Sequence, residues 1–534
     1  MIGALSAERA AISSRARQRA GTLASWNTLV VAGIAAVAAG IRFWNIQWLG
    51  YSHWDEYYFI ADAKTVGQIW PKGFGRIGWF VTPLTSYTDG TLFHFLGVHT
   101  WIPMAASALY GTAAAVAVYW LGSRLFGRAV GLIAAAVLAT AEFSVMFSRM
   151  ALADATFDFW LILSLLLIWL GFTRGFLRYY VLGGVSSGLL LNSKYDGACV
   201  LIFAVAWVLA EFAFDLLGRS QALTQLLSAY RVRIVGTAIL VGIAIALFAP
   251  FLIKLAVWPG LQIVLTHNEA NVVGSSVIKT PPTYLFQYFW LFTSAPTVLL
   301  ALAGILAGVI RFTQADRFLL LCTAGWIVAI MLFPPYPREA LSLLPPVAIW
   351  AGRAVLELYS WARGRSPRFG LLAGAAASLC VAAMLVGDAI PTAHALSLRT
   401  VGYKQAGAVA ARYQANGDDV FVRTQPVALL YVKTEYSLYP TPGVEQALNE
   451  KGTRAVLMTD QTVSWYQLTE QFFQLNRDHL QVLQRIPNPM YDEVLLQPAT
   501  SDRLAHLGDP PVDYRYITFW RVTGPLAFPP QWPR

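Results

Sequence analysis

Two adjacent acids, Asp55 and Glu56, are the residues best suited to chemistry, and they stand among aromatic side chains. They follow the first long apolar run, so we expect them at a membrane surface. A carboxylate there can act as a general base that takes a proton from an attacking hydroxyl group. The spacing of Ser52 and Asp55 also fits a capping box that starts a helix, and the two roles are compatible.

A second charged group, Arg149, Asp154 and Asp158, borders another apolar run. Asp154 and Asp158 are one helical turn apart and therefore share a helix face. Charges at the edge of a membrane span are costly unless they are paired or functional. We expect Asp154 to belong to the site. Asp158, and Glu142 in the preceding apolar run, fit equally well an ion-pair network that joins two helices.

Three further candidates, Lys194, His267 and Arg338, lie in segments predicted on the same side of the membrane. Lysine can hold a phosphate as a point charge, and the planar fork of arginine can bind two of its oxygens. Lys194 can equally extend to the membrane interface. Arg338 can also begin a helix there, but we favour its functional role. His267 and Glu269 are too few for a complete metal site.

The composition predicts that these residues belong to an integral membrane protein. Of 534 residues, 57% are hydrophobic and only 13% are charged, against about 25% charged in soluble domains. The net charge is +10, but arginines gather in short loops between apolar runs, which indicates membrane orientation and not nucleic-acid binding. The three cysteines form no C-x-x-C pair, so neither a zinc site nor a disulfide framework is expected.

About eleven apolar runs approach the roughly 20 residues that a hydrocarbon core requires. We expect spans at 27–44, 100–121, 129–147, 155–173, 179–192, 197–217, 234–256, 285–310, 317–333, 340–358 and 369–390, of which the fifth is short. Segments 45–98 and 257–284 are predicted as long outside loops. Apolar residues at helical spacing predict a surface helix over about 54–69 in the first loop.

The arginines predict the orientation, because lysine and arginine mark cytoplasmic loops. If residues 1–26 are a cytoplasmic arm, the inside loops contain almost no acids and many arginines. These arginines are Arg124, Arg128, Arg174, Arg178, Arg219, Arg231, Arg233, Arg311, Arg317, Arg363, Arg365 and Arg368. The opposite loops carry Asp55, Glu56, Asp154, Asp196 and Glu269. We therefore expect a plasma (inner) membrane protein with its N-terminus in the cytoplasm.

The composition changes after about residue 392. Strands are predicted at 418–423, 454–459, 492–496 and 516–521, and an amphipathic helix at 468–483. The expected fold class is therefore mostly α: a polytopic membrane domain over 27–391, followed by a small soluble extracytoplasmic α/β domain over 392–534.

Four segments resemble the GT-C membrane glycosyltransferases, in particular glycosyltransferase family 39 and its bacterial relatives, the protein O-mannosyltransferases and aminoarabinose transferases. The segments are Trp54-Asp55-Glu56-x-Tyr58, Ser148-Arg149-x-x-x-x-Asp154, the run from Gly188 to Lys194-Tyr195, and Arg338 followed by Pro345-Pro346. The last departs from the family pattern, since Glu339 replaces the usual tyrosine and the prolines are displaced. The resemblance covers about residues 25–390.

This resemblance implies an inverting transfer of a sugar from a polyprenyl-phosphate donor to an acceptor hydroxyl on the outer face of the membrane. It implies Asp55 as the base and Glu56 as the residue that orients Asp55 or binds the acceptor. Candidates for the donor phosphate, where positive charge would stabilise the leaving group, are Arg149, Lys194, His267 and Arg338. No cofactor is firmly expected, although a divalent ion beside the acids would be compatible. The acceptor can be a glycan, a lipid or a protein.

Other classes of function remain open. A transporter or flippase of a lipid-linked sugar would also need many spans, but should carry charges deep within them, where Glu142 is the main candidate. A transporter built from inverted repeats should show internal repetition, and none is visible. A scaffold that displays the C-terminal domain should tolerate Asp55→Asn. A ligase that transfers a whole glycan stays within the enzyme class.

Overall fold

The computed structural model describes residues 28–51, 54–72, 82–218, 223–257, 293–332, 337–365, 367–397, 402–424, 426–434, 444–460, 467–488 and 516–529. Within these residues, 8 helices are long and apolar enough to cross a membrane. They are the first helix (Thr28–Trp48), α4 (Trp101–Phe126), α7 (Asp154–Arg174), α9 (Ala198–Gly218), α10 (Leu223–Val257), α14 (Gln314–Met331), α15 (Leu344–Arg363) and α16 (Pro367–Ser397).

Shorter helices complete the described membrane part: α5 (Arg128–Thr140), α6 (Glu142–Phe147), α8 (Leu177–Leu191) and α13 (Ala295–Arg311). The run expected as one span at 129–147 is therefore two helices, which meet at Ala141. The run expected at 285–310 is described only from residue 293 onward. The expectation of a mostly helical, polytopic membrane protein is confirmed.

Small residues allow the membrane helices to pack closely. Gly304 on α13 lies against α15, where a Cβ atom on Gly304 would fall 2.1 Å from the carbonyl oxygen of Trp350. Trp350 is fully buried, and its indole N–H donates a hydrogen bond to Thr323 Oγ1 on α14 over 3.0 Å. Because lipid gives no hydrophobic force between helices, such close contacts are what hold a bundle together.

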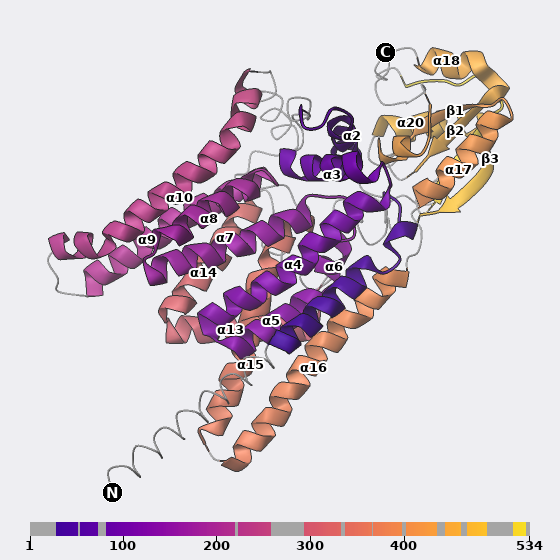
Figure 1. Ribbon diagram of the computed structural model, residues 1–534. Coiled ribbons are helices and arrows are strands. Elements are labelled where there is room, and N and C mark those ends of the chain that lie inside the picture. Colours follow the sequence, from indigo (N-terminus) through magenta and orange to yellow (C-terminus); the bar gives the residue numbers. More distant parts are fainter. Residues whose placement is uncertain are drawn as a thin grey trace, which may run out of the picture.

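Two helices between the first membrane helix and α4 lie side by side at one end of the bundle (Figure 1): α2 (Trp54–Ile69) and α3 (Pro83–Leu96). The sequence predicts α2, whereas α3 was not expected. Gly90 of α3 meets α2 so closely that a Cβ atom on it would fall 2.5 Å from Val66 Cβ. The pair forms a compact cover above the membrane helices.

The C-terminal part contains a four-stranded mixed sheet with the order β1-β2-β4-β3. Its strands are β1 (Asp419–Arg423), β2 (Ala455–Thr459), β3 (Leu480–Pro487) and β4 (Tyr516–Val522), and its helices are α17 (Gly402–Ala415), α18 (Val444–Lys451) and α20 (Gln467–Leu475). Strands β1 and β2 are parallel, whereas β4 runs antiparallel to β2 and β3. This sheet lies at the same end of the bundle as α2 and α3 (Figure 1).

One secondary-structure prediction in this part is wrong. The amphipathic helix expected at 468–483 ends at Leu475, and residues 480–487 form the edge strand β3. Pairing with β4 explains the difference. It provides hydrogen-bond partners for the backbone of a segment whose apolar residues fit the spacing of a strand as well as that of a helix. The strand expected at 492–496 and most of the loop expected at 257–284 lie outside the described residues.

Candidate active site

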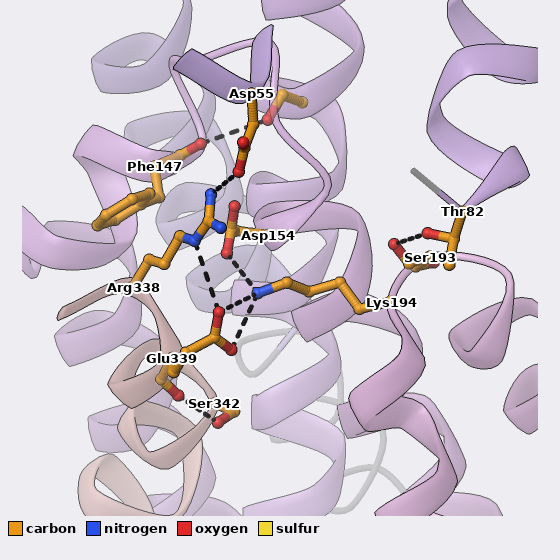
Figure 2. A network of polar contacts seen from close by, with 10 residues as sticks. Asp55, Thr82, Phe147, Asp154, Ser193, Lys194, Arg338, Glu339 and Ser342 are labelled. Carbon is orange, nitrogen blue, oxygen red and sulfur yellow. Dashed lines mark hydrogen bonds and ion pairs between the residues drawn. The ribbon is translucent and has the colours of Figure 1, made fainter. Parts of the chain in front are cut away.

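Five charged side chains from four separate segments meet at the end of the bundle below α2 (Figure 2). Asp55 is in the first turn of α2, Asp154 begins α7, and Lys194 lies between α8 and the 3₁₀ turn η3 (Tyr195–Gly197). Arg338 and Glu339 stand on η4 (Pro337–Leu343), the 3₁₀ segment that leads into α15. The structure therefore brings together four of the residues singled out from the sequence, together with Glu339.

Arg338 forms an ion pair with Asp55, and its guanidinium donates to Asp55 Oδ2. The two residues are 283 positions apart in the chain. Their side chains are 20% and 14% exposed, so the pair is largely shielded from water. The first carboxylate singled out from the sequence thus lies directly against one of the expected phosphate-binding cations.

Lys194 is held between two acids. Its Nζ atom lies 3.0 Å from Asp154 Oδ1 and 3.1 Å from each carboxylate oxygen of Glu339. Burial lowers the pKa of Lys194, but the carboxylates of Asp154 and Glu339 outweigh it, so the pKa lies above its ordinary value. The ammonium group is therefore charged at any physiological pH.

Glu339 joins the two cations, since its Oε1 atom also lies 3.5 Å from Arg338 Nε. In the sequence, Glu339 stands out only as a departure from the family pattern. Its place beside Arg338 was the one available signal, but residues at adjacent positions often point apart. The contact with Lys194 depends on the tertiary structure alone.

A small cavity opens beside this cluster. It is lined by Asp154, Phe157, Asp158, Lys194, Asp196, Trp326, Ala329, Ile330, Arg338, Glu339, Leu341 and Ser342. Asp158 is 4% exposed, and its Oδ1 atom has no hydrogen-bond partner among the described residues. Acids therefore outnumber cations around the cavity. No group of three or more potential metal ligands is found in the described part of the chain.

Glu56 has a different environment from its neighbour. It is 1% exposed, and Oε1 accepts a hydrogen bond from the backbone N–H of Ala151 over 2.7 Å. This bond ties the start of α2 to the turn between α6 and α7. It restrains the backbone that carries Asp55.

Arg149 contacts the last α-helical turn of the first helix, which ends at Phe43 before the short 3₁₀ turn at 46–48. Its Nη1 atom donates to the carbonyl oxygens of Ile41 (2.9 Å) and Arg42 (3.0 Å), which are the kind of helix-terminal acceptors left without intrahelical partners. Burial lowers the pKa of Arg149 to about 10. Arg149 is not part of the cavity lining, and His267, another expected phosphate ligand, lies outside the described residues.

Several solved structures with a similar fold are membrane glycosyltransferases. ArnT from Cupriavidus metallidurans, bound to undecaprenyl phosphate, has a TM-score of 0.57 at 14% identity, covering 94% of this chain and 99% of that protein. The oligosaccharyltransferase of Archaeoglobus fulgidus in the apo form has a TM-score of 0.58 at 15% identity, covering 82% of this chain and 70% of that one. The chain thus has the GT-C fold.

The sequence points to the same class. Residues 81–253 match the family model described as dolichyl-phosphate-mannose-protein mannosyltransferase, while no curated protein matches the chain. The expected resemblance and the expected enzyme class are confirmed to this extent: the chain has the GT-C fold, and its residues 81–253 match a family of membrane glycosyltransferases.

Proposed function

We propose that this glycosyltransferase moves a sugar from a polyprenyl-phosphate donor to an acceptor hydroxyl with inversion. The family description and the bound lipid of the ArnT structure support a donor of this chemistry. The observation that carries the proposal is the convergence of Asp55, Lys194 and Arg338 from three distant segments. A base and two cations at one place are what such a transfer requires.

The two cations suit the leaving group. As the bond between the anomeric carbon and the phosphate oxygen breaks, negative charge grows on the lipid phosphate. Arg338 and Lys194 would stabilise that charge, and the fork of Arg338 can bind two phosphate oxygens. Asp154 would hold Lys194 in position through their 3.0 Å contact. We retain His267 as a further candidate for the phosphate, whereas Arg149 in its observed contacts would hold the turn before α7.

Asp55 would act as the base. The acceptor oxygen forms the new bond to the anomeric carbon, its proton passes to the Asp55 carboxylate, and the electron pair of the broken bond stays on the phosphate. Glu56 would fix the geometry through its hydrogen bond to Ala151. Attack from the side opposite the phosphate inverts the anomeric centre. The acceptor would be a glycan, a lipid or a protein.

We further propose that the site faces the extracytoplasmic side of the plasma (inner) membrane. The helix ends away from α2 carry arginines, for example Arg124, Arg174, Arg311 and Arg363. Basic residues mark the cytoplasmic side. The N-terminus would then be cytoplasmic, and the C-terminal sheet would lie outside with the site.

The test is sugar transfer by the purified protein in liposomes, with a panel of radiolabelled polyprenyl-phosphate sugars and native membrane extract as acceptor. We expect Asp55→Asn to lower the transfer rate by at least about a hundredfold, in the range for loss of a general base. Asp62→Asn on the same helix is the matched control. Equal rates in both variants would remove Asp55 from the mechanism. Labelled lipid that crosses the bilayer without any transfer would instead favour a flippase.

A further inference from the structure

Glu339 occupies the point where the two candidate phosphate-binding cations converge. We propose that its carboxylate is a displaceable internal anion, which competes with the lipid phosphate for Lys194 and Arg338 and so promotes release of the polyprenyl-phosphate product. This inference rests on the proposed function, since it assumes that both cations bind the donor phosphate. It assigns a role to a residue that has none in the reaction as described above.

The geometry resembles a bound anion. Both carboxylate oxygens of Glu339 lie 3.1 Å from Lys194 Nζ, and one of them also lies 3.5 Å from Arg338 Nε. A phosphate would place two oxygens against the same two cations. The carboxylate and a lipid phosphate therefore cannot occupy this position together.

The charges explain why a carboxylate must move. Within the ion pairs of this cluster, Asp55, Asp154 and Glu339 contribute three negative charges against the two positive charges of Lys194 and Arg338. A phosphate added to this cluster would raise the excess of negative charge, and like charges in contact are destabilising. Tight binding of the phosphate thus requires that one of the three carboxylates leaves.

Glu339 is the carboxylate best placed to leave. Asp154 begins a long buried helix and is 4% exposed, and Asp55 is needed beside the acceptor. The Glu339 side chain is 15% exposed and has one more rotatable bond than an aspartate. Its own carbonyl oxygen accepts a hydrogen bond from Ser342 Oγ over 2.9 Å, a contact that restrains the backbone and does not involve the carboxylate.

Competition between Glu339 and the lipid phosphate matters most after the sugar has been transferred. The donor is a phosphodiester with one negative charge, whereas the product is a monoester with a charge near −2 at neutral pH. The two cations would therefore hold the product more tightly than the donor. A carboxylate that returns to Lys194 and Arg338 offsets this difference and frees the lipid phosphate.

The experiment measures binding of undecaprenyl phosphate to the purified protein in detergent by titration calorimetry. We expect Glu339→Gln to lower the Kd at least about tenfold, because the substitution removes the competing charge and keeps the side-chain size. Product inhibition of transfer should strengthen by a similar factor. Glu357→Gln is the matched control, since Glu357 of α15 also pairs with two arginines, Arg311 of α13 and Arg353 of α15, but at the helix end away from the site.

An unchanged or higher Kd for Glu339→Gln, in a protein with an unchanged melting temperature, would overturn the inference. If that variant fails to fold, Glu339→Asp takes its place, because a shorter carboxylate reaches the cations less well and should also tighten binding. Lys194→Gln separates this inference from the proposed function. If Lys194→Gln loses binding of undecaprenyl phosphate and Glu339→Gln does not bind it more tightly, only the competing role of Glu339 is rejected. If neither variant changes the Kd, both that role and the proposed phosphate site are rejected.

Discussion

At the scale of single residues, Asp89 on α3 is a buried acid that the proposed reaction does not use. It is 1% exposed, and its Oδ2 atom has no hydrogen-bond partner among the described residues. Burial raises the pKa of Asp89 to about 8. Buried Tyr51 and half-buried Tyr110 lie near Asp89. The acid is therefore protonated in the folded protein at neutral pH.

This raised pKa has a consequence for stability. Between about pH 4 and pH 8 the unfolded chain ionises Asp89 while the folded chain keeps the proton, so stability falls as the pH rises through this window. We expect Asp89→Asn to remove that dependence and to melt at a higher temperature than the native protein at pH 8. The difference in melting temperature between the variant and the native protein should shrink toward pH 4. Melting curves in detergent at both pH values measure it, and a difference of the same size at both would contradict the linkage.

At the scale of elements, the contact between α13 and α15 shows how the membrane helices are held together. Gly304 faces the backbone of Trp350, and one turn later Gly308 faces its ring, where a Cβ atom would fall 2.6 Å from the indole carbons. Any larger side chain must push the two helices apart. Because α15 continues from η4, a shift of α15 would also move Arg338 and Glu339.

We therefore expect Gly304→Val to destabilise the protein by about 1–3 kcal/mol or more, the usual cost of overpacking, and to lower the melting temperature in detergent. Transfer activity should fall with it. Gly325→Val on α14 is the control, since nothing lies within 4 Å of a Cβ atom at that position. Equal melting temperatures for the two variants would mean that the α13–α15 contact is looser than the structure describes.

At the scale of the whole molecule, the C-terminal part touches the element that carries Asp55. The 3₁₀ turn η5 (Pro426–Leu430) packs against α2. The hydroxyl of the adjacent Tyr431 accepts a hydrogen bond from the backbone N–H of Tyr51 over 2.6 Å, and the two rings lie 5.9 Å apart. The entry to α2 is thus restrained from both sides, by Tyr431 above and by the Glu56–Ala151 bond below.

We expect Tyr431→Phe to remove the hydrogen bond and keep the ring contact. Loss of one buried hydrogen bond costs about 1 kcal/mol, so the Tyr51 amide should exchange its hydrogen roughly fivefold faster. Hydrogen–deuterium exchange read out by mass spectrometry on peptides that span Tyr51 measures this. Tyr413→Phe, on α17 and packed on Phe519 of the sheet, is the control. Unchanged exchange at Tyr51 would show that the two parts are held by other contacts.

Much of the architecture follows from the sequence, because the forces concerned act on local runs of residues. A span needs about 20 apolar residues in a row, so the long helices could be placed from hydropathy. The helix α2 could be placed from apolar spacing. The acids of the site could be assigned to one side of the membrane because arginines accumulate on the other.

Contacts between distant segments could not be predicted in this way. Periodicity does not report which cation meets which acid, so the pairing of Arg338 with Asp55 and of Lys194 with Glu339 required the tertiary structure. The same holds for Arg149, which lies at the end of the first helix, and for β3, where pairing with β4 decided between a strand and a helix. The sequence alone determined the long apolar helices, the candidate residues for chemistry and the class of enzyme that the chain resembles. Only the fold decided which charges touch, because ion pairs depend on the positions of atoms from segments hundreds of residues apart.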